Sequence, residues 1–106
     1  MPDARENQFL EVLTHFPGDA TTLFGLASYY RDSGRHDEAI QRYRECLEAD
    51  PHYGAAYLNL GELLKAKGDV EEARRVLKAA IERAESKGDV EIVNIAGERL
   101  KELDEG

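Results

Sequence analysis

Histidine and cysteine are among the side chains that most often ligate metals or act as nucleophiles, and in this sequence their spacing suits neither role. The histidines are His15, His36 and His52, and no two of them are three or four residues apart, so no pair can share one face of a helix. The single cysteine, Cys46, follows the apolar spacing of its segment, which predicts a buried, inert thiol. One cysteine also excludes an internal disulfide.

Glycine-rich loops and paired carboxylates can also support catalysis, but the positions of these residues predict other roles. Gly34 and Gly68 are placed to end helices and do not form a glycine-rich phosphate loop. The adjacent carboxylates Glu71 and Glu72 are expected on a solvated helix face, where they cannot work as an acid–base pair. We therefore expect no catalytic residue, no metal site and no cofactor, and a protein that is not an enzyme.

The charge balance limits the kind of partner. Among 106 residues, 22 are acidic and 14 are basic, which gives a net charge of -8. That charge disfavours nucleic acid and anionic membrane surfaces, and it favours a neutral or basic protein or peptide partner. The polar start of the chain, Met1 to Glu6, does not resemble a secretory signal, and no apolar run approaches the ~20 residues of a membrane span. These features predict a cytoplasmic protein.

Apolar spacing and helix-ending residues predict six helices. Phe9, Val12, Leu13 and Phe16 form one helical stripe, and Asp3 can cap that helix in a capping box with Glu6. The same criteria place the expected helices at 3–16, 19–33, 37–49, 54–67, 69–87 and 89–103. The fifth helix is expected to be long because no proline stops it before Gly88.

Part of this pattern recurs after 34 residues. Leu23, Leu26, Ala27, Tyr30, Gly34, Ala39 and Cys46 correspond to Tyr57, Leu60, Gly61, Leu64, Gly68, Ala73 and Ala80. A fixed internal period indicates a repeat architecture in which each helical hairpin must stack on its neighbours to bury its apolar face.

The spacing resembles that of the tetratricopeptide repeat. The matching positions are Leu23, Leu26, Ala27, Tyr30, Ala39, Tyr43 and Pro51 in the first copy, and Tyr57, Leu60, Gly61, Leu64, Ala73 and Leu77 in the second. The resemblance implies an all-α, right-handed α-solenoid of antiparallel helix hairpins with about six helices. We expect one domain over 1–106, with an N-terminal half-repeat helix at 3–17, repeat one at 20–53, repeat two at 54–87 and a capping helix at 89–103.

The resemblance also implies where a partner would bind, because the first helix of each hairpin lines the concave surface in this family. The implied partner-binding residues are Thr21, Phe24, Ser28, Arg31, Asp32, Leu58, Asn59, Glu62, Lys65, Asn94 and Glu98. Phe24 and Leu58 are equivalent apolar positions and are the expected anchors. One subclass binds a partner's C-terminal carboxylates through lysine and asparagine, but Phe24 and Ser28 occupy two of those positions, so we expect no such clamp here.

Three functions are compatible with a helical repeat. The leading hypothesis is a protein-interaction module that binds an extended or helical partner segment in its groove. The second is a self-assembling scaffold, a homodimer formed through the terminal helices, because the first helix lacks a hairpin partner. The third, a nucleic-acid-binding repeat, would need a basic groove and is disfavoured by the acidic composition.

Overall fold

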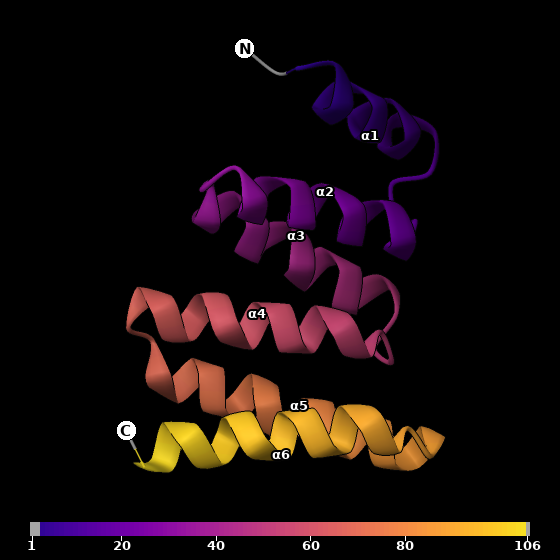
Figure 1. Ribbon diagram of the computed structural model, residues 1–106. Helices are drawn as coiled ribbons and strands as arrows, with labels where there is room; N and C mark the ends of the chain where they lie inside the picture. Colours follow the sequence, from indigo (N-terminus) through magenta and orange to yellow (C-terminus); the bar gives the residue numbers. More distant parts are fainter. Residues whose placement is uncertain (1–2, 106) are drawn as a thin grey trace. The chain divides into compact units, whose positions relative to one another are not determined.

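The computed structural model describes residues 3–105, which form six α-helices and no strand (Figure 1). The helices are α1 (Ala4–His15), α2 (Ala20–Asp32), α3 (His36–Ala49), α4 (Gly54–Lys67), α5 (Val70–Lys87) and α6 (Val90–Glu105). Each predicted helix is present, and its ends agree with the prediction to within two residues. Within the described residues, no helix is both long enough and apolar enough to cross a membrane.

The chain divides into two compact units, Met1–Pro51 and His52–Gly106. The first contains α1, α2 and α3, and the second contains α4, α5 and α6. The division lies close to the predicted border between the two repeats, where Pro51 prevents α3 from continuing.

Local capping accounts for the start of α1, α2, α5 and α6 and for the end of α4 and α5. The Asp3 side chain accepts a hydrogen bond from the Glu6 backbone N–H, and Asp19, Asp69 and Asp89 cap α2, α5 and α6 in the same way. At the other end, Gly68 and Gly88 adopt positive φ angles of 93° and 70°, a conformation that glycine adopts without a steric penalty. As expected from the missing proline, α5 continues to Lys87.

The core of the first unit lies between α2 and α3. Its buried positions include those of the repeat pattern, Leu23, Leu26, Ala27 and Tyr30 on α2 and Ala39, Tyr43 and Cys46 on α3, together with Ile40. Gly25 lets α1 approach α2, because a Cβ atom there would lie 2.7 Å from Cε1 of Phe9. Val12 and Phe16 do not join this core, and their exposed fractions are 41% and 66%.

The core of the second unit is formed by all three of its helices. The buried positions from the repeat pattern are Tyr57, Leu60, Gly61 and Leu64 on α4 and Ala73, Leu77 and Ala80 on α5. Ala84 of α5 and Ala96 and Leu103 of α6 are buried as well. Gly61 lets the α4 backbone approach α5, because a Cβ atom there would lie 3.1 Å from Cδ2 of Leu77. The absence of a side chain at Gly61 thus permits close packing of α4 and α5.

One local prediction was wrong. Glu6 was expected to complete a capping box with Asp3, but its carboxylate turns away from the helix start and is 4% exposed. It accepts hydrogen bonds from the Tyr30 hydroxyl at 2.7 Å and from Nη1 of Arg35 at 2.7 Å. The Arg35 guanidinium also lies 4.3 Å from the centre of the Tyr30 ring and pairs with Glu38 at 2.6 Å. This cluster, in which Glu6 and Tyr30 are buried and Arg35 and Glu38 are partly exposed, connects α1 to α2 and α3.

Candidate functional site

The predicted binding residues of the first unit lie along α2, and three of them meet at Tyr43 of α3. The Tyr43 side chain is completely buried, and its ring contacts that of Phe24 edge to face at 5.6 Å between centroids. Ser28 Oγ lies 2.8 Å from the Tyr43 hydroxyl oxygen, and Nη1 of Arg31 donates to the same oxygen at 3.4 Å. Phe24, Ser28 and Arg31 are half-buried. The buried Tyr43 side chain therefore contacts all three of these partly exposed side chains.

The remaining two residues of this set are at the edges of the same face. Thr21 is exposed near the start of α2, and Asp32 is exposed at its end. Asp32 pairs with Arg31 at 2.9 Å, which balances the charge of the guanidinium. Burial raises the pKa of the Tyr43 hydroxyl, so the hydroxyl is neutral at physiological pH and remains available as a hydrogen-bonding group.

Sequence reasoning assigned Tyr43 only to the core and missed the role of its hydroxyl in positioning the α2 face. A signal was present, because the position 34 residues later is Leu77, which has no polar atom in its side chain. A tyrosine at a buried position needs a hydrogen-bond partner for its hydroxyl, and that partner is found on the predicted binding face.

In the second unit, Leu58 is not an exposed anchor. Its side chain is 8% exposed, whereas the equivalent Phe24 is half-buried. The backbone carbonyl of Leu58 accepts a hydrogen bond from Nη1 of Arg99 at 3.2 Å, which connects α4 to α6. Asn59, the next residue, is half-buried.

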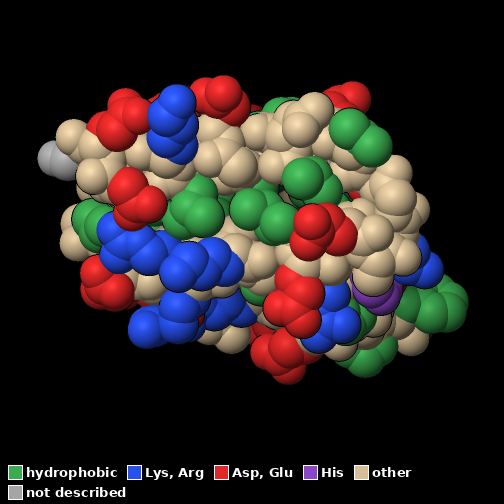
Figure 2. All heavy atoms as spheres, turned by 90° about the horizontal axis from the view of Figure 1, so that it is seen from below, with side chains coloured by type: hydrophobic (Ala, Val, Ile, Leu, Met, Phe, Trp, Pro, Cys, Tyr) green, Lys and Arg blue, Asp and Glu red, His purple; other side chains and the backbone are tan. Residues whose placement is uncertain are grey.

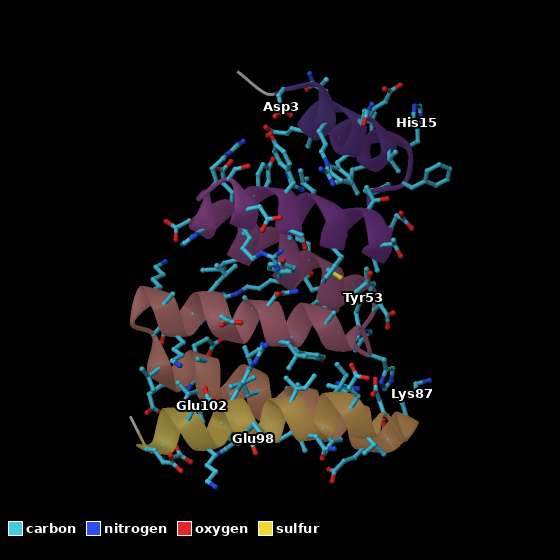
Figure 3. The ribbon with its side chains drawn as sticks, in the orientation of Figure 1. Asp3, His15, Tyr53, Lys87, Glu98 and Glu102 are labelled. Carbon is cyan, nitrogen blue, oxygen red and sulfur yellow. The ribbon has the colours of Figure 1, made fainter. Side chains whose placement is uncertain are left out.

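Polar residues of α4 and α6 flank a small cavity in this unit. Glu62 and Lys65 are exposed on α4, and both line a cavity of about 80 Å³ together with Gly61, Leu77, Arg99, Glu102 and Leu103. Nη1 of Arg99 lies 3.4 Å from Oε2 of Glu62. Asn94 and Glu98 are exposed on α6 but do not line the cavity; Figure 3 labels Glu98 and Glu102 on this helix.

In the part of the chain that the structure describes, the cysteine is buried and the histidines are exposed. Cys46 is completely buried, as predicted, and burial raises the pKa of its thiol to about 11, so the thiolate is not populated at neutral pH. His15, His36 and His52 are exposed on separate segments. Within residues 3–105, no three side chains of histidine, cysteine, aspartate or glutamate are close enough together to hold a metal ion.

The surface of the second unit on its α6 side is mixed in character. Figure 2 shows apolar side chains reaching the surface between acidic and basic ones. Such a surface suits contact with a partner that offers both apolar and polar groups.

The fold defines an all-α repeat protein, an α-solenoid built from helical hairpins. Proteins of this class are generally non-catalytic interaction modules. Sequence models of the tetratricopeptide repeat match residues 30–90 and 6–53. The chain is 31% identical over 86 residues to the TPR repeat-containing protein PA0015 of Pseudomonas aeruginosa, an alignment that covers 81% of this chain and 82% of that protein. The chain therefore belongs to the tetratricopeptide repeat family.

Solved structures show the same fold. Protein BPP2914 from Bordetella parapertussis has a TM-score of 0.80 with 26% identity, covering 99% of this chain and 90% of that one. The TPR2B domain of yeast Sti1, solved as a complex with pHsp70, has a TM-score of 0.70 with 21% identity, covering 89% of this chain and 81% of that one.

Proposed function

We propose that this protein is a non-catalytic interaction module that binds an extended or helical segment of a partner protein. The observation that carries the proposal is the face of α2, where the half-buried Phe24 ring rests on Tyr43 beside Ser28 and Arg31. An aromatic anchor held by a buried residue and surrounded by polar groups is typical of the residues that dominate binding energy at interfaces. The Sti1 domain, which has this fold and was solved with pHsp70, supports the general role.

Polar residues of the second unit form a separate set of proposed partner contacts. Asn59, Glu62 and Lys65 on α4, with Asn94 and Glu98 on α6, offer hydrogen-bond donors and acceptors to a partner's backbone and side chains. The chain carries a net charge of -8, so we propose a neutral or basic partner segment. That the protein acts in the cytoplasm stays a prediction.

The first test uses an array of neutral, basic and acidic peptides, followed by calorimetry on the best-binding peptide. We expect Phe24→Ala to weaken binding of that peptide by about tenfold or more, because an interface anchor is truncated. Val90→Ala is the matched control, since Val90 is 67% exposed at the start of α6 and lies outside the proposed site. Unchanged affinity in Phe24→Ala would show that the α2 face is not the binding surface.

Leu58→Asp is unsuitable for the same test. A carboxylate at this buried position would destabilise the second unit and reduce binding for that reason alone. Asn59→Ala is the better variant of α4, because it removes a half-buried amide without introducing a charge.

Self-assembly is the second candidate function, and the outer face of α1 supports it. Val12 and Phe16 expose 41% and 66% of their surface beside a shallow hollow that they line together with Gln8, Glu11 and His15. Val12 lies in the last turn of α1 and Phe16 directly follows the helix, and two adjacent exposed apolar side chains are suited to a two-fold contact with a second copy. We propose a homodimer through α1 as the alternative function.

Sedimentation analysis tests this alternative. The wild-type protein should sediment as a dimer at high micromolar concentration, and Phe16→Asp should be monomeric because the charge would be buried in the contact. Val90→Asp places the same charge at an equally exposed apolar position of α6 and should leave the dimer intact. A wild-type protein that stays monomeric at this concentration would eliminate the homodimer.

A further inference from the structure

The cavity in the His52–Gly106 unit has an apolar floor. Gly61 of α4, Leu77 of α5 and Leu103 of α6 lie at its base, and their exposed fractions are small. The absence of a side chain at Gly61 leaves Leu77 accessible from the cavity, and no aromatic ring lines it. Its volume of about 80 Å³ is roughly half of the ~150 Å³ that holds benzene in an apolar protein cavity, so the space fits a few aliphatic carbons.

The mouth of the cavity carries two pairs of opposite charges. Figure 1 shows α4 and α6 running in the same direction. Glu62 of α4 pairs with Arg99 of α6 at 3.4 Å. One turn further along the two helices, Lys65 and Glu102 line the same cavity, and within residues 3–105 neither has an ion-pair partner. Glu62 and Arg99 thus form an ion pair, whereas Lys65 and Glu102 do not pair with each other.

The charges at the mouth and the apolar floor together determine which chemical group the cavity can bind. Two cationic and two anionic side chains surround the mouth, so their formal charges sum to zero. A charged side chain placed on the apolar floor would lose its hydration and find no counter-ion of its own. The Lys65 ammonium can donate a hydrogen bond to a carbonyl, and the Glu102 carboxylate can accept one from an N–H. A peptide group presents both of these.

We propose that this cavity binds one uncharged aliphatic side chain of leucine size from a partner segment, with the segment's own backbone hydrogen-bonded to Lys65 and Glu102. The inference rests on the proposed interaction function and specifies what the second unit recognises. It places the anchor of the second unit in this cavity rather than at Leu58, which is buried.

The smallest probe of this chemistry is N-acetyl-leucine N-methylamide, which has a leucine side chain between two peptide groups and no charge. Titration into the isotopically labelled full chain should shift the NMR signals of Gly61, Leu77 and Leu103 saturably in the millimolar range. The alanine analogue should bind at least about tenfold more weakly, because it has three fewer carbons to bury. The lysine analogue should also be weaker, since its charge cannot enter the apolar floor.

Glu102→Met tests the location, because it removes the acceptor and places an aliphatic side chain at the mouth of the cavity. The variant should lose the leucine-induced shifts. Glu105→Met, the same change at an exposed residue of α6 outside the cavity, should retain them. Equal binding of the leucine and alanine probes, shifts confined to other residues, or unchanged shifts in Glu102→Met would each overturn the proposal.

The cavity and the proposed function can fail separately. A peptide whose binding depends on Phe24 but is unaffected by Glu102→Met would retain the interaction function and eliminate the cavity as its anchor. A leucine probe that binds in the cavity, with no peptide sensitive to Phe24→Ala, would support the cavity and remove the α2 face from the site.

Discussion

Arg35→Ala should lower the melting temperature of the protein by roughly 10 °C, because it leaves a buried carboxylate without its counter-charge. Glu6 is 4% exposed and accepts from Nη1 of Arg35 at 2.7 Å and from Nη2 at 3.2 Å. The Tyr30 hydroxyl, the other donor to Glu6, cannot replace a full positive charge. Circular dichroism during thermal unfolding measures the change.

Arg75→Ala is the matched control for this prediction. Arg75 is on α5, its side chain is 71% exposed, and it pairs with Glu72 three residues away. Surface pairs of this kind contribute little, so the melting temperature should change by no more than about 2–3 °C. If the two arginine variants melted at the same temperature, the Glu6 cluster would have no special role in stability.

The pH dependence of the same variant gives an independent check. Hydrogen bonds from Arg35 and then from Tyr30 hold the pKa of Glu6 below its ordinary value. A depressed folded-state pKa contributes stability above the unfolded pKa of about 4.3, and this stability is lost as the pH falls through the lower folded value. Removing Arg35 removes the main cause of the depression. The stability difference between wild type and Arg35→Ala should therefore narrow as the pH falls below about 4.

The helix boundaries could be predicted because their causes are local. Aspartates at the helix starts, glycines with positive φ at the ends and Pro51 act within a few residues, and each is visible in the sequence. The buried stripe could be predicted for a similar reason, since the 34-residue period repeats the same helix packing.

Glu6 was misassigned because its true partners are distant in sequence. Tyr30 and Arg35 are 24 and 29 residues away, whereas Asp3 is three residues away and fits a familiar local motif. A local pattern cannot reveal that a long-range ion pair will compete for the same carboxylate.

The repeat also could not predict burial at equivalent surface positions. Phe24 and Leu58 occupy the same place in successive copies, yet one is half-buried and the other is buried. The period fixes the position of the backbone, while the exposure of a side chain depends on neighbours that differ between the copies. The cavity was missed for the same reason, since it needs residues from three helices.

Tyr43 is the residue at which stability and binding can be separated by two substitutions. Tyr43→Ala should cost about 3–5 kcal/mol of folding free energy, because it empties a completely buried position. Tyr43→Phe keeps the ring that contacts Phe24 and removes only the hydroxyl, so it should cost about 1 kcal/mol. Denaturant unfolding measures both values.

Tyr43→Phe should nevertheless weaken peptide binding several-fold, because Ser28 and Arg31 lose the atom that holds them on the binding face. Tyr29→Phe provides the control, since it deletes a hydroxyl of the same unit that donates to Asp3 and does not contact the proposed site. Calorimetry with the peptide selected on the array compares the two variants at a temperature where both are folded. Equal affinities for wild type and Tyr43→Phe would restrict Tyr43 to the core, and the α2 face would then be organised by Phe24 alone. A loss in Tyr43→Phe without a loss in Tyr29→Phe would show that a core residue also positions the groups that contact the partner.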